Sequence, residues 1–437
     1  MTDPPLPPDF IAAITAQLGD EAADFLATYE RPATYGLRGN PAKITLGRLR
    51  ELIGWDLEPI PWCPTGAYVD PAHRAGSHPY HAAGLYYLQE PTAMAVAEMA
   101  RIRPGDAVLD LAAAPGGKAT QAASAIGPHG LLVANEIHPV RIKALGENLE
   151  RWGSAPVVLT NATPEQLRGV GPVFDRVIVD APCSGEGLFR REPEARSEWS
   201  SARVAGSADR QRDILAAAIE LVRPGGILVY STCTFNEREN EGVVDWLVSG
   251  NREWRLDERL RLWPHHVRGE GHVVSRLVRG GSTGERGPVR TGESDDPSAR
   301  TTWDQFAGEQ FERDPIADLP GRLIWRSDRL MLATDHVLDL AGVPVVRDGL
   351  WLGERKPGRF EPSHALALAI TAEFARNRPD FDVDGARRWI AGEPVSAAGT
   401  AGWTLVTVDG FPLGWGKRTG TTVKNHYPKG LRRAIRC

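Results

Sequence analysis

From about Pro91 to Arg279 the sequence alternates short apolar runs with segments long enough to form helices. This alternation is typical of βαβ units, in which parallel strands share one sheet and helices cover its two faces. The expected strands are 107–111, 131–135, 156–159, 176–179, 227–230 and 272–277, and the expected helices are 118–126, 140–152 and 210–221. The pattern therefore predicts an α/β fold with a Rossmann-like, doubly wound and mainly parallel sheet.

The segments on either side of this core have a different composition. The first ninety residues combine one helical stretch with a passage rich in Pro, Gly and aromatic residues, which predicts a small α/β extension. After Arg279 the chain becomes rich in Gly, Ser, Thr and charge, as expected of a flexible linker, and the remainder shows short β-like runs with one helical stretch near 363–376. We predict an N-terminal extension at 1–92, the core at 93–279, a linker at 280–302 and an α+β module at 303–437.

Composition excludes several classes of protein. No segment offers about 18 consecutive apolar residues, and the N-terminus lacks the pattern of a signal peptide, so neither a membrane partner nor secretion is expected. The four cysteines, Cys63, Cys183, Cys233 and Cys437, are scattered singly, which indicates reduced thiols in a cytoplasm and neither a disulfide framework nor a metal clip. His265 and His266 have no cysteines at ligand spacing, so we expect no metal site. Cys63 is expected to be structural, while Cys437 has no assigned role.

A glycine turn follows the first strand of the predicted sheet. Strand AVLDL runs into AAAPGGK, where Gly116 and Gly117 allow a close approach of backbone to ligand and the next helix presents unpaired N–H groups. The sequence matches neither the dinucleotide nor the P-loop pattern. About twenty residues later the next strand ends at Glu136, where a carboxylate can accept both hydroxyls of a ribose. Together these features favour a cofactor that contains adenosine.

Two cysteines follow the fourth and fifth predicted strands. Cys183 lies in Asp180-Ala-Pro-Cys-Ser-Gly and Cys233 in Thr-Cys-Thr-Phe-Asn. In the common strand order 3-2-1-4-5 these strands are neighbours and ligands bind at their carboxyl ends, so both thiols should face the cofactor site. Cytosine carbon 5 is too electron-poor to attack a methyl donor, but a thiolate added to carbon 6 makes carbon 5 nucleophilic. A carboxyl such as Asp180 can stabilise the adduct near N3, and a second thiol can assist product release.

These segments resemble a known family. DLAAAPGGK, NEIHPVRIKALGENLERWG, DAPCSGEGLFRR and YSTCTFNERENEG are similar to motifs of the Nol/Nop/Sun RNA (cytosine-5)-methyltransferases, and within them to the bacterial RsmF type. YGLRGNPAKIT and GLYYLQEPTAM resemble segments ahead of the catalytic domain, and PLGWGKRTGTTVKNHYPKGLR resembles a PUA-like RNA-binding module. The resemblance implies an S-adenosylmethionine-dependent methyltransferase core. It also implies ribosomal RNA as partner, with 16S rRNA preferred over 23S rRNA and tRNA, and a monomer is expected.

Residue by residue, the resemblance implies that Cys233 is the nucleophile, that Cys183 helps to release the product and that Asp180 lies between cofactor and base. The implied cofactor contacts are Ala112, Ala113, Ala114, Pro115, Gly116, Gly117, Lys118, Glu136, Arg141, Asn161 and Asp180. Asn161 stands where the family often has an acid that meets the adenine amine. Spacing alone leaves open which thiol attacks, because DNA cytosine-5 methyltransferases use the Pro-Cys thiol; the second thiol here favours the RNA type.

Basic residues are concentrated at the C-terminal end, although the net charge is −5. From Lys417 onward there are seven Lys and Arg residues and no acid, with Trp415, His426 and Tyr427 among them, a composition that suits phosphate and base contacts. The candidate RNA-binding residues are Lys417, Arg418, Lys424, Lys429, Arg432 and Arg433, with Arg436 in the same run and Arg190 and Arg191 as further candidates. Four tryptophans are expected in cores or domain contacts: Trp152, Trp199, Trp246 and Trp263.

Three alternatives to an RNA methyltransferase remain at this stage. A non-catalytic ribosome-assembly or RNA-binding factor would keep the fold but would not need both Cys183 and Cys233. A dithiol redox protein would need a C-x-x-C arrangement, which the sequence lacks. A DNA methyltransferase would be expected to carry Pro-Cys-Gln in place of the Pro-Cys-Ser found here.

Overall fold

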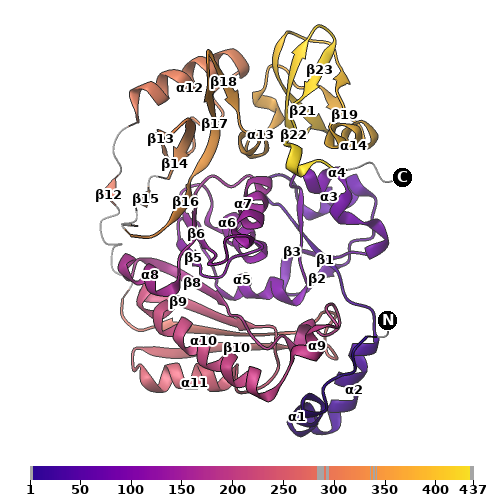
Figure 1. Ribbon diagram of the computed structural model, residues 1–437, viewed down its shortest axis with the longest axis vertical. Coiled ribbons are helices and arrows are strands. Elements are labelled where there is room, and N and C mark those ends of the chain that lie inside the picture. Colours follow the sequence, from indigo (N-terminus) through magenta and orange to yellow (C-terminus); the bar gives the residue numbers. More distant parts are fainter. Residues whose placement is uncertain are drawn as a thin grey trace.

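The computed structural model describes residues 3–282, 290–291, 295–334, 336–337, 340 and 342–433. Arg436 and Cys437 lie outside these residues. A central α/β core, from residue 93 onward, occupies the middle of the molecule, with the first helices at one end and the C-terminal sheets at the other (Figure 1). No helix among the described residues is long and apolar enough to cross a membrane.

The core is built on an eight-stranded sheet in the order β10-β11-β9-β8-β5-β6-β7-β16. Its strands are β5 (Ala107–Asp110), β6 (Leu131–Asn135), β7 (Val157–Thr160), β8 (Phe174–Asp180), β9 (Val222–Thr232), β10 (Trp254–Leu262), β11 (His272–Arg279) and β16 (Val345–Asp348). The strands from β7 to β9 are parallel and follow the predicted order 3-2-1-4-5, while β10, β11 and β16 are antiparallel additions. The predicted Rossmann-like fold is confirmed.

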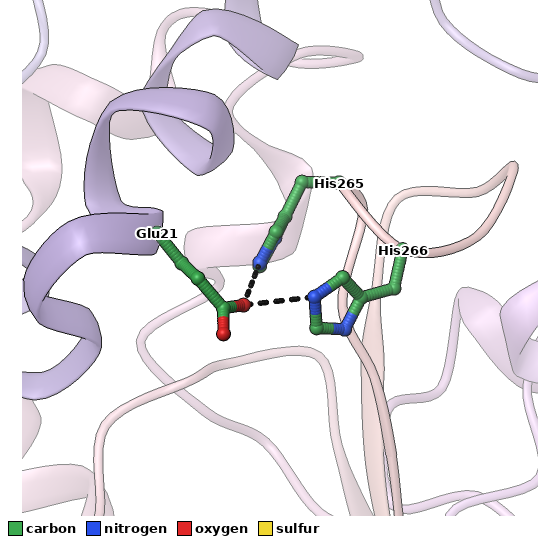
Figure 2. A group of neighbouring side chains, drawn as sticks. All are labelled: Glu21, His265 and His266. Atoms are coloured by element: carbon green, nitrogen blue, oxygen red, sulfur yellow. Dashed lines mark hydrogen bonds and ion pairs between the residues drawn. The ribbon is translucent and has the colours of Figure 1, made fainter.

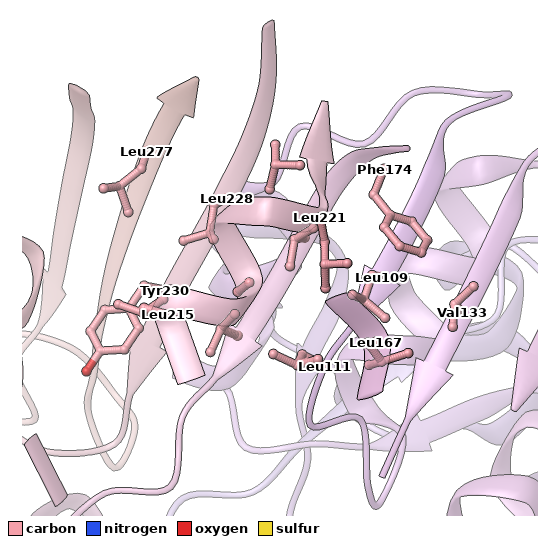
Figure 3. Packing of buried hydrophobic residues seen from close by; sticks show 14 of the residues in the cluster. Leu109, Leu111, Val133, Leu167, Phe174, Leu215, Leu221, Leu228, Tyr230 and Leu277 are labelled. Carbon is pink, nitrogen blue, oxygen red and sulfur yellow. The ribbon is translucent and has the colours of Figure 1, made fainter. Parts of the chain in front are cut away.

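Helices cover both faces of this sheet because its strands are apolar on both sides. One face packs against α5 (Ala95–Met99), α6 (Gly117–Ile126) and α7 (Arg141–Trp152). The other face packs against α8 (Pro164–Leu167), α10 (Ser201–Leu221) and α11 (Glu241–Gly250). Figure 3 shows this second interior, where leucines of the helices meet leucines of the strands. All four residues of β5 are buried, as expected of a central strand.

Several elements are longer or more numerous than the sequence indicated. Helix α10 begins at Ser201, nine residues before the predicted start at 210, because the Ser200 side chain caps it by accepting from the Arg203 N–H. Strand β10 and helix α11 were not predicted. Most residues of β10 are exposed or half-buried, and its mixed charges hide the alternation that marks a strand.

The N-terminal extension contains a helical pair and a small sheet. The single helical stretch predicted near residues 10–29 is two helices, α1 (Pro8–Leu18) and α2 (Ala22–Ala27), because Gly19 at φ 56° ends the first. The sheet has the order β2-β3-β1-β4. Its strands are β1 (Gly36–Gly39), β2 (Pro59–Ile60), β3 (Cys63–Tyr68) and β4 (Tyr86–Leu88), and the accompanying helices are α3 (Leu46–Ile53) and α4 (Pro79–Ala82).

The described residues of the C-terminal region form two larger sheets and the two-stranded pair β12-β15, and they give one strand to the core. One sheet contains β13 (Arg322–Arg326), β14 (Arg329–Ala333), β17 (Leu350–Lys356) and β18 (Arg359–Pro362). The other contains β19 (Asp380–Phe381), β20 (Val395–Ser396), β21 (Gly402–Val408), β22 (Phe411–Thr419) and β23 (Thr422–Asn425). The remaining elements are α9 (Ala195–Glu198), β12 (Arg290–Thr291), α12 (Pro297–Gln310), β15 (His336–Val337), α13 (His364–Ala369) and α14 (Val383–Ala391).

Two features of this region differ from the sequence prediction. Helix α12 begins at Pro297, inside the range predicted as linker, because Asp296 caps it by accepting from the N–H groups of Ser298 and Ala299. Strand β16 does not belong to the C-terminal sheets but pairs with β7, next to Asn161. The five-stranded sheet also shares a hydrophobic cluster with the N-terminal sheet, so the two ends of the chain pack together.

Candidate active site

Cys183 and Cys233 lie beside each other at the carboxyl end of the central sheet. They follow β8 and β9, parallel strands whose last pairs join Asp180 to Ser231. The two Sγ atoms are 3.3 Å apart, and both thiols are free and half-buried. The hydrogen bond to Cys233, together with burial, raises the pKa of the Cys183 thiol well above its usual range. Cys183 therefore holds its proton firmly, and either sulfur can donate in the contact between the two thiols.

Asp180 forms a buried ion pair next to the thiols. Its carboxylate accepts from Lys118 Nζ at 2.7 Å and from Ser231 Oγ at 2.8 Å. Burial favours the neutral acid, but the Lys118 ammonium and the two hydrogen bonds outweigh it and hold the pKa of Asp180 below its usual value. A negative carboxylate and a positive ammonium are thus both available at the strand ends.

Two buried glutamates that we did not single out from the sequence hold the cysteine loops together. Glu186, in the Pro-Cys loop, accepts from the N–H groups of Phe235 at 2.6 Å and Asn236 at 3.2 Å in the other loop. Glu239 reaches back from the other loop and accepts from the Ser184 N–H at 2.9 Å. An acid in a Gly-rich turn reads as solvent-exposed in a sequence, so only the fold reveals these contacts.

The glycine turn after β5 leads into α6 as predicted. Gly116 has φ 117°, a left-handed conformation that favours glycine, and it precedes the first residue of α6. Arg38, from the N-terminal sheet, is buried and donates to the Gly117 carbonyl at 3.0 Å and to Thr120 Oγ1 at 2.6 Å. The N-terminal extension therefore positions the turn. Arg38 lies far from the turn in sequence, which is why sequence reasoning missed it.

Glu136 lies at the end of β6 in a form suited to a ligand. It is 2% exposed; Oε1 accepts from the His138 N–H, while Oε2 has no hydrogen-bond partner among the described residues and lies 3.5 Å from Arg141. Arg141 also donates to the Ala114 carbonyl at 2.6 Å, which links it to the glycine turn. Asn161 lies nearby, but its amide nitrogen donates to the carbonyls of Glu136 and Ile137. The amide nitrogen of Asn161 therefore supports the loop after β6, and both of its hydrogens are already used there.

Asp110, the last residue of β5, supports a polar ligand at this place. It is fully buried, no side chain among the described residues donates to its oxygens, and its one hydrogen bond is with the Ala112 backbone N–H. Burial raises its pKa to about 7, partly opposed by Lys118. A buried carboxylate with so few donors is expensive unless a ligand supplies more. The carboxylates of Asp110 and Glu136, whose oxygens have lone pairs to spare, fit together with the glycine turn a ligand with a cationic amine and ribose hydroxyls.

The structure overturns part of the predicted RNA-binding surface. Arg418 is 3% exposed, and Trp415 and Tyr427, proposed as base contacts, are 3% and 5% exposed. Trp415 instead donates to the Ser363 carbonyl inside the C-terminal core. Trp415 and Arg418 are three residues apart on β22, so they lie on opposite faces. Six of the nine residues of this middle strand are buried, because both of its faces are covered. Of the other basic candidates, Lys424, Lys429 and Arg433 are exposed, whereas Lys417 and Arg432 are half-buried.

Two further predictions need correction. Arg190, considered for phosphate contact, is buried and pairs with Glu270 at 2.6 Å, so its role is structural. Trp246, expected in a core, is 41% exposed on α11. Trp152 and Trp199 are buried as expected, and Trp263 stacks on Phe235. Arg191 remains accessible beside the ring of Tyr35, 5.1 Å from its centroid.

One group among the described residues has the composition of a metal site: Glu21, His265 and His266, with ligand atoms within 4.8 Å of one another. Figure 2 shows both imidazoles directed at one oxygen of Glu21, at 3.0 and 2.8 Å. A metal-bound histidine usually donates its other ring N–H to an acceptor, but Nδ1 of His265 is buried without a partner. These contacts fit a hydrogen-bonded clamp between α2 and the loop after β10. The absence of a metal stays a prediction.

Comparison with known proteins covers nearly the whole chain. Residues 6–91 match the N-terminal domain of 16S rRNA methyltransferase RsmF, and residues 97–277 match 16S rRNA methyltransferase RsmB/F. Residues 305–370 match the RsmF rRNA methyltransferase first C-terminal domain, and residues 376–433 match the methyltransferase RsmF PUA domain. The region after the linker thus corresponds to two family domains.

Individual relatives agree with this result. Ribosomal RNA small subunit methyltransferase F of Serratia proteamaculans is 31% identical over 98% of this chain and 96% of its own length. The Klebsiella pneumoniae protein of the same name is 33% identical over 96% and 94%. A solved methyltransferase homologue from Pyrococcus horikoshii superimposes with a TM-score of 0.57 at 25% identity, covering 62% of this chain and 94% of that one. The chain therefore belongs to the RsmF family of ribosomal RNA methyltransferases, and it is an RNA methyltransferase.

Proposed function

We propose that this protein transfers a methyl group from S-adenosylmethionine to carbon 5 of cytosine in small-subunit ribosomal RNA, through a covalent bond between Cys233 and the base. The observation that carries this proposal is the pair of free thiols, 3.3 Å apart, beside the buried Asp180 carboxylate. Methylation at a nitrogen or an oxygen needs no thiol. Two thiols at one strand end suit carbon 5, where a nucleophile must be added and then removed.

The cofactor site supports S-adenosylmethionine as the donor. The Glu136 carboxylate, which has a free lone pair beside its ion pair with Arg141, can accept the ribose hydroxyls, and the buried Asp110 carboxylate can accept a cationic amine. Residues 112–118 and Arg141, which donates to the Ala114 carbonyl, are the further proposed cofactor contacts. When bound, the cofactor supplies an electrophilic methyl group. Asn161 holds the loop after β6 and is assigned a supporting role there.

In the first step the Cys233 thiolate adds to carbon 6 of the base. The electron pair moves through the ring toward N3, which takes up one proton from water, and carbon 5 becomes nucleophilic. Asp180, held as a carboxylate by Lys118, stabilises the protonated N3 of this adduct. The Cys183 thiol, which donates toward Cys233, keeps the attacking sulfur in place.

In the second step carbon 5 bonds to the methyl group and the adduct then breaks down. The carbon 5 proton and the proton on N3 pass to water, the electron pair left at carbon 5 restores the ring double bond, and the bond between carbon 6 and Cys233 breaks. Cys183 is protonated and adjacent, so it donates its proton to the departing sulfur. Cys183 regains a proton from solvent. Cys233 thus acts as the nucleophile and Cys183 as the acid.

Ribosomal RNA of the small subunit is the substrate that the relatives' names favour. The PUA-like module, with exposed Lys424, Lys429 and Arg433, provides a second RNA contact away from the thiols. We place the reaction in the cytoplasm, on a base that is unpaired or taken out of its stack. Large-subunit rRNA and tRNA are the alternative substrates, and a non-catalytic assembly role is the alternative function.

Bisulfite sequencing of total RNA from cells with and without the gene tests the proposal. Loss of protection at a discrete 16S rRNA cytosine, restored by the wild-type gene and not by a Cys233→Ala gene, is the expected result. Loss at a 23S rRNA or tRNA cytosine would keep the chemistry and move the substrate. Unchanged protection at every cytosine would contradict the proposal and favour the assembly role.

A further inference from the structure

His272 is a buried histidine that the mechanism above does not use. It is the first residue of β11 and is 7% exposed. The register between β11 and β9 pairs Val274 with Ser231 and ends at Val273 and Thr232, so His272 lies just beyond the last pair, two residues from Val274 and on the same face. Residues opposite each other in an antiparallel pair lie on the same face. His272 therefore lies on the side of the sheet that carries the thiol, Ser231 and Asp180.

Electrostatic contacts agree with this placement. Burial is the main reason why the pKa of His272 is lowered; the Lys118 ammonium lowers it further, and the Asp180 carboxylate opposes the shift. His272 in turn is one of the groups that lower the pKa of Asp180. The imidazole is thus a neutral ring beside the ion pair that faces the base.

A fixed chain of hydrogen bonds determines which ring nitrogen carries the proton. The Thr92 hydroxyl donates its only proton to Glu90 Oε2 at 2.5 Å, since a carboxylate can only accept. Thr92 Oγ1 is 3.1 Å from His272 Nδ1, and it has only lone pairs left for that contact. The Glu90 oxygen also lies 3.7 Å from Nδ1. Nδ1 therefore bears the hydrogen, and Nε2 of the neutral ring bears a lone pair.

Nε2 is not among the buried unpartnered side-chain atoms of the described residues, and the side-chain contacts of the ring are made by Nδ1. A backbone hydrogen bond with Gly271 also acts on the ring. Glu90 itself is held in place, because its two oxygens accept from the N–H groups of Ala93 and Glu270, both at 2.8 Å. The acceptor on Nε2 is thus preorganised and points away from the Thr92 side of the ring.

The proposed chemistry needs such a group. A carboxylate at N3 accepts from the N3–H of uracil readily, so Asp180 alone does not select cytosine. The two bases differ at the adjacent ring position, where cytosine presents an amino donor and uracil a carbonyl acceptor. We propose that Nε2 of His272 accepts a hydrogen bond from the cytosine amino group and rejects uracil, as a specificity-determining residue. This inference rests on the proposed function.

The test measures covalent trapping, since a base with fluorine at carbon 5 cannot complete breakdown of the adduct. Target RNA carrying 5-fluorocytosine or 5-fluorouracil is incubated with enzyme and S-adenosylmethionine, and adducts are timed on denaturing gels. Wild type should trap the cytosine analogue far faster. His272→Gln should lower this preference at least about tenfold. The Gln amide can turn to accept from the cytosine amino group or to donate to the uracil carbonyl, whereas a fixed acceptor leaves the uracil carbonyl without a partner.

Thr92→Val is the matched control for the tautomer. It leaves His272 in place but removes the oxygen that holds the proton on Nδ1, so the preference should again fall. Cofactor affinity and melting temperature report folding, and a merely structural role would change both rates together and leave their ratio intact. An unchanged ratio in folded variants overturns the inference, as does accumulation of an adduct on ordinary cytosine RNA, which would indicate proton removal by His272. Failure of wild type to trap either base would instead contradict the proposed function.

Discussion

The ends of β8 and β9 and the middle of β22 both carry polar or reactive residues next to apolar ones, but the fold uses them differently. After β8 and β9, Cys183 and Cys233 leave the sheet and meet at its rim, 3.3 Å apart. In β22, Trp415 and Arg418 stay within an antiparallel strand and are buried. A residue beyond the end of a parallel strand lies where ligands bind. A residue within β22 is buried on either face, because this middle strand of its sheet is covered on both sides, so its chemistry alone is a poor guide.

The largest effect is expected at the rim. Cys233→Ala should lower methylation by at least about a thousandfold, because removing the covalent nucleophile removes the reaction path. Binding of S-adenosylmethionine, measured by calorimetry, should stay within about twofold, since the cofactor contacts lie on other loops. Cys63→Ala is the matched thiol control and should retain methylation, because Cys63 lies in a separate cluster with Met94. Full activity of the Cys233 variant would contradict the assignment.

The second thiol separates attack from release. Cys183→Ala should still form the bond to carbon 6 but should release product slowly, because the acid next to the departing sulfur is gone. A protein–RNA band that survives denaturant and disappears on RNase treatment is the expected observation. If the roles are reversed, the band will appear with Cys233→Ala and not with Cys183→Ala.

In the C-terminal region the expected effect is on stability. Trp415→Ala should lower the free energy of unfolding by about 3–5 kcal/mol, as for other large-to-small changes in a core. Trp415 is 3% exposed, contacts Phe306 and Phe311, and donates to the Ser363 carbonyl. Denaturant unfolding measures the loss. A stable variant with weakened RNA binding would restore the original interpretation of Trp415 as a base contact.

Asp110→Asn should raise the free energy of unfolding, in contrast to Trp415→Ala. The pKa of Asp110 is about 7 in the folded chain against 3.8 for the unperturbed group. The unfolded chain ionises first as pH rises, so this residue lowers stability progressively between about pH 4 and pH 7, and the loss is complete above pH 7. Without cofactor, the Asn variant should therefore match wild type near pH 4 and exceed it by about 2–4 kcal/mol at pH 8. If the variant is no more stable at pH 8 than wild type, the ionised Asp110 carboxylate does not destabilise the folded chain.

The same variant should bind S-adenosylmethionine more weakly, since an amide attracts a cationic amine less than a carboxylate does. If the variant gains stability and loses affinity for the cofactor, the Asp110 carboxylate destabilises the free protein but contributes to ligand binding at the strand ends. Unchanged affinity would remove Asp110 from the proposed cofactor contacts.

These differences explain what the sequence could predict. The strand order, the glycine turn and the positions of Cys183 and Cys233 follow from local patterns, because a βα turn and its residues are contiguous in the chain. Arg38, Glu186 and His272 act through contacts with distant segments: Arg38 reaches Gly117, and His272 reaches Thr92. No local pattern indicates such pairs. The burial of Trp415 and Arg418 depends on the covering of both faces of β22 by other segments, which no local pattern of residues indicates.

The smallest effect is expected from exposed charge on the C-terminal sheet. Lys424 and Lys429 are exposed, so Lys424→Ala with Lys429→Ala should weaken binding of a 16S rRNA fragment by only a few fold at moderate salt. If both lysines contact phosphates, the slope of log affinity against log salt should fall by about 1.4–1.8, because each contact releases a counterion. Arg418→Met is the control: Arg418 is 3% exposed, so this change should lower the melting temperature and leave the salt slope unchanged. A reduced slope for the Arg418 variant alone would mean that β22 opens on binding RNA, and the contrast between rim and strand would then fail.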